Sequence, residues 1–463
     1  MNDHHERPPF HFQHHTRCRL GVAVLLAAAM LIAAASNGRA EDEAKPDTFR
    51  AAAAEVDITP DQPIGISNLR GLSTGIADRM YARVLVIDDG TAPIAIVTAD
   101  VVGCPISYAR ALGKSIEEAS GIPADRVMFN CSHSHNVPGV GLPADPEEPS
   151  FGRDVLEKIT EMTATAVDRL KPARLAVGRE RCQIGFNRLM PTPGRVTMTV
   201  NPDGPVVPWV DVLAAYGHDG SRIGILFSYA AHPVVIHSSS TLISADFPGR
   251  AATHLRRMLG QGERKGGVMM FAQGCGGNIN AFPLKGGIDA ADRVGLVLAQ
   301  AVTRVQLRDV APARIRSASH EVALPFQEPL SVEEAEKLLA QRPGDLRYQR
   351  LANLAKAGPS PDMPYPMSAF AIGDQVCILA LPHETFCDYQ LWADEQSPYG
   401  ETLVFGYTGG VQGYVAAKQD LDYGLLRAGY GAQMTNSRMP LKPACEAIIH
   451  QGISDLWQKL EEK

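Results

Sequence analysis

Short apolar runs of strand length alternate along the chain with longer segments in which apolar residues recur at helical spacing. Three stretches, 83–100, 212–232 and 368–382, each predict two strands joined by a turn. In the first stretch, Asp89 and Gly90 lie at the expected turn. Helices are predicted at 107–120, 154–170, 247–259, 289–306, 331–340, 384–394 and 441–461.

The combination of hairpins with strand–helix alternation decides the expected fold class. It favours an α/β fold, with mixed β-sheets flanked by helices, over a purely parallel doubly wound sheet. The polar, Pro-rich stretch 341–366 is predicted to be a surface excursion and not a domain boundary. We therefore expect one large domain over residues 45–463.

The first 40 residues differ from the rest of the chain. A His-rich, basic lead is followed by an uncharged run at 20–36 and by the small-residue end 37-NGRA-40. This order predicts a signal peptide at 1–40, cleaved after Ala40, and hence an exported protein, periplasmic or secreted, with no integral membrane span left after cleavage. The alternative is an uncleaved membrane anchor, because the uncharged run approaches spanning length.

Charge and cysteine usage narrow the function classes. The net charge of −7 comes without a basic stripe, which argues against a nucleic-acid partner. After removal of the leader, an odd number of cysteines remains, so an exported chain keeps at least one free thiol. We expect these residues to be mostly buried and structural, and a Cys377–Cys387 bridge is left open. The remaining cysteines are 104, 131, 182, 275, 377, 387 and 445.

Polar residues follow several predicted strands, where α/β proteins collect catalytic groups. His133 and His135 lie in 127-VMFNCSHSH-135, and on an extended chain both face one site. A metal site, acid–base chemistry and two ordinary polar residues are open interpretations of this pair. His232 follows the apolar run 225–231, where the alternative is a core histidine with one hydrogen bond. His237 is placed on a loop.

Three more segments carry candidate chemistry. Glu384 follows a strand that ends at Pro382 and opens a predicted helix, where the helix dipole alone favours a carboxylate. Tyrosines in 403–416 are packing residues unless strong positive charge lies beside them. The Gly-rich loop in 268–283 is predicted to bring backbone amides near a ligand. This loop has neither the Walker signature nor a serine nucleophile elbow.

Several motifs follow one another along the chain: 55-EVDITP-60, 74-TGIADRMYARVLVIDDG-90, 132-SHSHNVPG-139, 231-AHP-233, 271-FAQGCGGNIN-280, 381-LPHETF-386 and 413-GYVAAKQDLDYG-424. Taken together and in this order, they resemble the catalytic domain of the neutral/alkaline (non-lysosomal) ceramidase family. The resemblance implies a ceramidase-like fold and one Zn²⁺ ion whose bound water attacks an amide carbonyl of a ceramide-like or other N-acyl substrate, small or lipid-like.

The resemblance also implies roles for individual residues. His135 would move a proton, and Arg188 would hold a substrate oxygen. Tyr423 and Tyr430 match tyrosines near the family's active site more loosely. The zinc ligands carried over from the family are His133, His232, Glu384 and Tyr414.

The chain departs from the family pattern in two places. Asn280 stands where the family has its active-site serine, so we expect an amide to donate a hydrogen bond there, to the substrate or the developing oxyanion. The chain ends at Lys463, so no C-terminal β-sandwich domain is expected. The alternatives are that the same site cleaves another ester, lactone or N-acyl compound, or that the protein binds a metal or ligand without catalysis. Asp246 is either a carboxylate partner of a ligand histidine or a helix N-cap.

Overall fold

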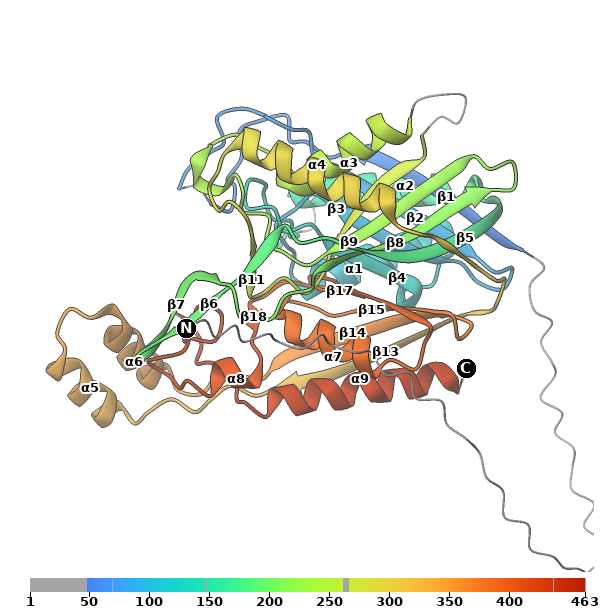
Figure 1. Cartoon of the computed structure of the whole chain (residues 1–463). Coiled ribbons are helices and arrows are strands. Elements are labelled where there is room, and N and C mark those ends of the chain that lie inside the picture. Colours follow the sequence, from blue (N-terminus) through green and yellow to red (C-terminus); the bar gives the residue numbers. More distant parts are fainter. Residues whose placement is uncertain (1–47, 69, 146–147, 261–265, 436, 463) are drawn as a thin grey trace, which may run out of the picture. The chain divides into compact units, whose positions relative to one another are not determined.

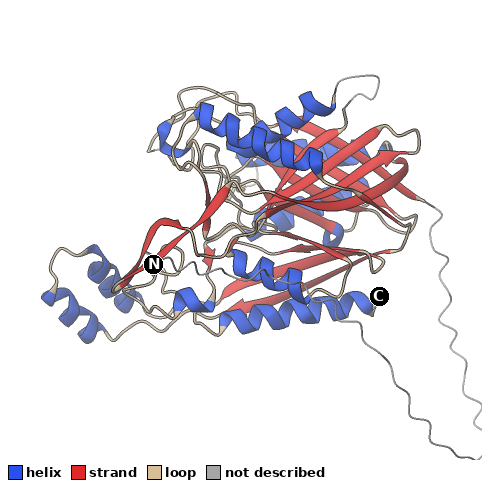
Figure 2. Cartoon of the chain, in the orientation of Figure 1, coloured by secondary structure: helices blue, strands red, loops and turns tan. Residues whose placement is uncertain are grey.

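Two β-sheets pack face to face, and helices cover their outer faces (Figures 1 and 2). The computed structural model describes residues 48–68, 70–145, 148–260, 266–435 and 437–462. The predicted signal peptide at 1–40 lies outside these residues. The predicted α/β class with mixed sheets flanked by helices is confirmed.

The larger sheet is mixed, with strand order β10-β9-β8-β5-β1-β2-β3-β4, and β12 pairs with β5. The pairs β3–β4 and β9–β10 are parallel, whereas the hairpins β2–β3 and β8–β9 are antiparallel, as predicted. Its strands are β1 Phe49–Asp57, β2 Tyr81–Asp88, β3 Ile94–Ala99, β4 Val127–Cys131, β5 Lys171–Arg181, β8 Trp209–Gly217, β9 Arg222–Tyr229, β10 Val268–Gln273 and β12 Arg308–Val310.

Three smaller sheets carry the remaining strands of the described residues. The second large sheet has the order β13-β14-β15-β17, and its β14–β15 hairpin is the one predicted at 368–382. Its strands are β13 Ile315–Leu324, β14 Met363–Ile372, β15 Val376–Ala380 and β17 Glu401–Phe405. Two short sheets comprise β6 Gly185–Thr192, β7 Arg195–Asn201 and β11 Ile279–Ala281, and then β16 Glu384–Thr385 with β18 Tyr414–Val415.

Alternation along the central strands explains the two-layer core. On β2, Leu85 and Ile87 belong to the core between the sheets, whereas Val84 and Val86 belong to the core under the helices. Each of these side chains contributes about 1.5–3 kcal/mol when fully buried. Because the strand is apolar on both faces, its sequence is a near-continuous hydrophobic run and not a strict alternation.

The helices divide between the outer faces of the two large sheets. The helices α1 to α4 pack against the first sheet, and α7 and α9 pack against the second. The bounds are α1 Ile106–Ser120, α2 Phe151–Asp168, α3 Asp246–Leu259, α4 Ile288–Arg304, α5 Val332–Gln341, α6 Leu346–Ala357, α7 Cys387–Gln396, α8 Lys418–Leu421 and α9 Cys445–Glu461, with short 3₁₀ turns at Ala124–Arg126 and His237–Ser239.

Three local predictions are corrected. The helix expected from 384 begins at Cys387, because Glu384 and Thr385 pair with β18 as a short strand. The stretch 341–366 contains α6 and the start of β14, so it is more than a surface loop. The Cys377–Cys387 bridge is wrong, since every cysteine in the described residues is buried and free.

In the part of the chain that the structure describes, no helix combines the length and the apolar character needed to cross a bilayer.

Candidate metal centre

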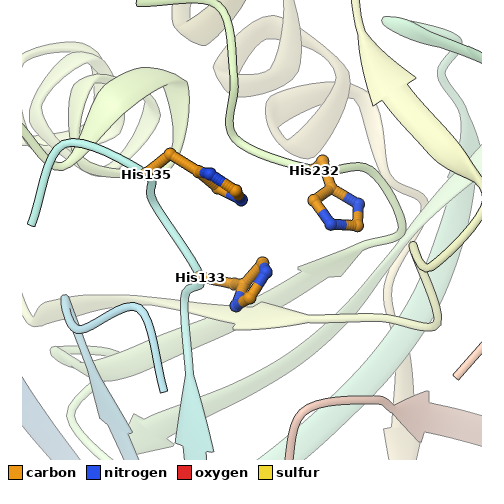
Figure 3. Close-up of side chains that lie close together, drawn as sticks. All are labelled: His133, His135 and His232. Carbon is orange, nitrogen blue, oxygen red and sulfur yellow. The ribbon is translucent and has the colours of Figure 1, made fainter. Parts of the chain in front are cut away.

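His133 and His135 lie in the turn that follows β4, not on the strand itself. The strand ends at Cys131, and His133 has a φ of 63°, a left-handed conformation that costs roughly 1–2 kcal/mol for a non-glycine residue. The two rings nevertheless point toward one another (Figure 3), and their centroids are 5.1 Å apart. The prediction that both rings face one site therefore agrees with the structure, but strand geometry is not the reason.

His232 reaches the same place from the segment after β9. Its backbone N–H donates to Ile279 O at 2.9 Å, which joins it to β11. Its ring centroid lies 5.0 Å from that of His133 and 5.7 Å from that of His135 (Figure 3). One ring nitrogen from each of these histidines lies within 4.8 Å of the others, a spacing that can hold a metal ion.

A two-stranded ladder places Glu384 and Tyr414 beside the histidines. These residues are register partners in the parallel pair β16–β18, and Glu384 N–H donates to Gly413 O at 2.9 Å. Glu384 Oε2 lies 3.0 Å from His232 Nε2 and 3.3 Å from His133 Nε2. The Tyr414 hydroxyl lies 3.4 Å from His232 Nε2. The structure thus brings together all of the residues predicted as ligands.

Backbone contacts determine which ring nitrogens face the centre. His232 Nδ1–H donates to Gly276 O at 2.7 Å, and His133 Nδ1–H donates to Val102 O. With both rings neutral, the Nε2 lone pairs point at Glu384 Oε2, so either a proton on one ring or a metal cation has to lie between these acceptors. His133 Nε2 and His135 Nε2 are also buried without a hydrogen-bond partner. This donor set fits a metal cation.

The pKa directions agree with such a site. Burial lowers the pKa of His232 to about 4, and the positive charge of Arg188 adds to this effect. Burial also lowers the pKa of His135 well below its usual range. Burial acts to raise the pKa of Glu384, but charge interactions and hydrogen bonds with His133 and His232 outweigh it and hold this pKa well below the usual range. Neutral imidazole and carboxylate are the forms that bind metals.

Arg188 and Asn280 form the side of the centre next to Tyr414. Arg188, buried on β6, donates from Nη1 to Asn280 Oδ1 at 3.1 Å and from Nη2 to Gly277 O at 2.6 Å. Its guanidinium lies over the Tyr414 ring at 5.3 Å. Because Arg188 engages the carbonyl oxygen of the Asn280 side chain, the amide N–H₂ group of that side chain is left to donate elsewhere.

The two loosely matched tyrosines have different surroundings. The Tyr430 ring packs 5.2 Å from that of Tyr414 and 5.1 Å from the Arg188 guanidinium. Tyr423 instead lines a separate hollow with Asn187 and is 40% exposed. The structure therefore places Tyr430 beside the centre and does not bring Tyr423 into it.

The Gly-rich loop was predicted to bring backbone N–H groups near a ligand, and this prediction is wrong. The N–H groups of Gly274, Gly276 and Gly277 donate to protein carbonyls, and Cys275 N–H donates to Gln390 Oε1. The loop presents its carbonyl oxygens, which accept from His232 and Arg188. A Cβ at Gly277 would come within 2.3 Å of Glu384 O, so glycine allows this backbone to pack against the Glu384 strand.

Four other residues clarify the surroundings of the centre. Tyr407, which the sequence analysis did not single out, is buried with its ring 4.5 Å from that of His133. The His237 ring stacks 5.3 Å from that of His135. His383 Nε2 donates to Pro364 O at 2.8 Å. Asp246 accepts from Ile236 N–H at 2.8 Å and from Phe247 N–H at 2.6 Å, and its carboxylate accepts no hydrogen bond from His133, His135 or His232. It is the first residue of α3 and not the N-cap, which is Ala245.

Comparison with known proteins places this geometry in a known fold. No protein-family model matches the chain. The structure of a ceramidase complexed with C2 is similar, with a TM-score of 0.70 and 19% identity, covering 90% of this chain and 75% of that one. The chain has a ceramidase-like fold. Neutral ceramidase from Pseudomonas aeruginosa is similar too, with a TM-score of 0.66 and 19% identity over 87% of this chain and 73% of its own.

Proposed function

We propose that this protein is a zinc-dependent hydrolase that cleaves the amide bond of N-acyl compounds. The observation that carries the proposal is the meeting of the Nε2 atoms of His133 and His232 with Glu384 Oε2, while both Nδ1–H groups donate to backbone carbonyls. A buried carboxylate in such a cluster needs a positive charge beside it, which either a metal ion or a protonated ring supplies, and in this proposal zinc supplies it. The ceramidase-like fold supports the choice of amides as the first substrates to test.

We assign the zinc ligands to His133, His232, Glu384 and Tyr414. Zinc accepts imidazole and oxygen ligands in one small shell, and both histidines have the second ring nitrogen held by a backbone carbonyl, as ligand histidines commonly do. Zinc bound there supplies Lewis acidity, which lowers the pKa of a coordinated water and polarises a substrate carbonyl.

The chain's own residues supply the remaining steps. His135 is neutral and lies beside the two ligand rings. It accepts a proton from the water that attacks the carbonyl and donates this proton to the leaving amine. Asn280 Nδ2, oriented because Arg188 holds Oδ1, donates to the substrate oxygen as negative charge develops on it. In this proposal residues 45–463 form the catalytic domain, and 1–40 direct export to the periplasm or outside the cell.

Zinc content and amidase activity of alanine variants test the ligand assignment. The three histidines within 4.8 Å offer a rival set in which His135 replaces Glu384. We expect His133→Ala, His232→Ala and Glu384→Ala to lose zinc and at least about a thousand-fold in kcat/KM. His135→Ala should keep close to one zinc per chain and lose about 10²–10⁴-fold in kcat, the range of general acid–base catalysis.

The matched control is His218→Ala, since His218 is exposed. Zinc is measured by mass spectrometry after desalting, and activity is measured on ceramide, short N-acyl amides and esters. If His135→Ala loses zinc and Glu384→Ala keeps it, the rival ligand set, in which His135 replaces Glu384, is the correct one. Full zinc in both His133→Ala and His232→Ala would overturn the metal centre, and chelator-insensitive activity would overturn the mechanism.

A further inference from the structure

A cavity of about 430 Å³ shares one lining residue, Tyr414, with the proposed metal centre. Tyr414, whose hydroxyl is 3.4 Å from His232 Nε2, lines this cavity together with Tyr430. Phe326 and Met363 contribute apolar surface to it. A molecule bound in this cavity therefore lies next to a proposed metal ligand and has room for an apolar portion.

The charge on the cavity wall is positive. Arg350, from α6, and Arg438, which precedes α9, are the charged side chains among the described residues that line it. Both are half-buried, and neither forms an ion pair with a described carboxylate. Arg438 Nη2 donates to Gln412 O at 2.7 Å, and the Arg438 guanidinium lies 5.8 Å from the Phe326 ring centroid.

Two guanidinium groups without counter-ions favour an anion in the cavity. Arginine carries its charge at every physiological pH and binds planar oxyanions through two parallel N–H bonds. Partial burial strengthens the attraction, because the groups are less screened by water than on an open surface. The apolar residues beside the arginines suit the hydrocarbon portion of the same molecule.

We propose that Arg350 and Arg438 bind a carboxylate of the substrate, so that this enzyme acts on N-acyl compounds bearing a negative charge, such as N-acyl amino acids. The proposal rests on the proposed amide hydrolase function and adds a substrate class to it. A neutral ceramide has no group to pair with these arginines.

A purely structural role for Arg438 must be separated from this one. The bond from Arg438 to Gln412 O holds the segment that leads to Tyr414, so loss of the side chain can disturb the centre without any role in binding. Such a disturbance lowers activity on all amides equally. A role in anion binding changes the ratio between charged and neutral substrates.

The test compares kcat/KM for N-octanoylglycine with that for N-octanoylglycinamide, in which a neutral amide replaces the carboxylate. For the zinc-loaded protein we expect a preference of at least tenfold for the charged substrate. Arg438→Gln and Arg350→Gln should each reduce this ratio about tenfold, equivalent to about 1.4 kcal/mol, and mainly through KM. Arg438→Lys should recover part of the ratio, and the exposed Arg342→Gln is the matched control. N-octanoyl-O-phosphoethanolamine tests whether a phosphate replaces the carboxylate.

The outcomes separate this proposal from the hydrolase function itself. Equal cleavage of both octanoyl compounds, or an unchanged ratio in both arginine variants, overturns the carboxylate assignment and leaves the hydrolase in place. A preference for the phosphate compound over the carboxylate moves the assignment to phosphate. If no amide is cleaved, calorimetric titration with the same two octanoyl compounds decides, and equal affinity for both overturns the anion site independently of catalysis.

Discussion

Two buried polar clusters in this protein solve the problem of buried charge in different ways. Arg179 donates to Asp211 at 2.6 Å and to Asp394 at 2.7 Å, and its guanidinium lies 4.4 Å from the Trp209 ring centroid. Each carboxylate there meets a cation that belongs to the chain. In the cluster of His133, His232 and Glu384, by contrast, no lysine or arginine among the described residues forms an ion pair with the carboxylate, which meets the two imidazole rings instead. The first cluster is neutralised by its own arginine, whereas the second is the one that we propose a metal ion completes.

A third cluster uses a proton instead of a cation. Burial raises the pKa of Asp420 to about 7, and the negative charges of Asp388 and Glu446 add to this effect. Near neutral pH this carboxyl therefore carries a proton for part of the time. The three clusters show that a group of carboxylates and histidines predicts little by itself, because the partner that neutralises it decides its role.

The largest expected stability effect comes from breaking the complete cluster. Arg179→Met leaves Asp211 and Asp394 without their cation and should lower the free energy of unfolding by about 3 kcal/mol at pH 8. Burial raises the pKa of Asp211 to about 6 even though Arg179 acts to lower it, so removal of the arginine raises this pKa further. A proton then replaces the arginine at pH 5, and the loss of stability should be smaller there. Chemical denaturation at both pH values measures this.

The control for Arg179→Met is Arg174→Met on the same strand, where a more exposed arginine pairs with Asp309. This change should cost less than about 1 kcal/mol. Zinc content should be unchanged in both variants. A pH-independent loss at Arg179, or a loss as small as that at Arg174, would contradict the contrast between the clusters.

The next effect has the opposite sign and concerns the metal-free protein. Glu384→Gln places an amide N–H₂ donor beside the Nε2 atoms of His133 and His232, so it should raise the free energy of unfolding of the chelator-treated protein by about 1–2 kcal/mol. The same change should abolish zinc binding, because a neutral amide replaces the anionic ligand. Thermal unfolding with and without chelator gives both values. If the metal-free wild type is as stable as the variant, Glu384 Oε2 and the two Nε2 atoms do not repel one another.

The last prediction tests whether Asp420 holds the proton of the third cluster. Asp420 has a folded pKa near 7, above its usual 3.8, so its contribution to stability is fully present below about pH 4 and is lost as the pH rises through 7. Asp420→Asn should therefore reduce the loss of stability between pH 5 and pH 8 by about 1–2 kcal/mol. Denaturant midpoints across this range measure the slope. If stability changes with pH equally in the variant and the wild type, Asp420 does not hold the proton.

Much of the fold was predictable because its strands and helices have strong local signals. The hairpins at 83–100, 212–232 and 368–382 were found because apolar runs flank short polar turns. The start of the helix predicted from 384 was wrong, because pairing with a distant segment at Tyr414 holds Glu384 in a strand. Pairing between segments so far apart leaves no periodic pattern in either one.

The candidate site was only partly accessible from the sequence. Motif resemblance brought His133, His232, Glu384 and Tyr414 to attention, and the structure brings them together. Tyr407 was interpreted only as one of the packing tyrosines of 403–416, because a buried tyrosine resembles any other packing residue until its neighbours are known. The Gly-rich loop was misinterpreted, because residue type does not reveal whether a backbone presents N–H or carbonyl groups.

The sequence by itself determined the class of the fold, the position of most strands and helices, and the residue types available for metal chemistry. These features depend on local propensity and on the spacing of apolar residues, which a linear chain displays directly. Only the tertiary structure decided that His133 turns through a left-handed conformation, that the Nδ1 atoms are held by Val102 O and Gly276 O, and that Arg350 and Arg438 share a cavity beside Tyr414. The direction of a lone pair and the lack of a counter-ion are relations between distant segments, so they exist only once the chain has folded.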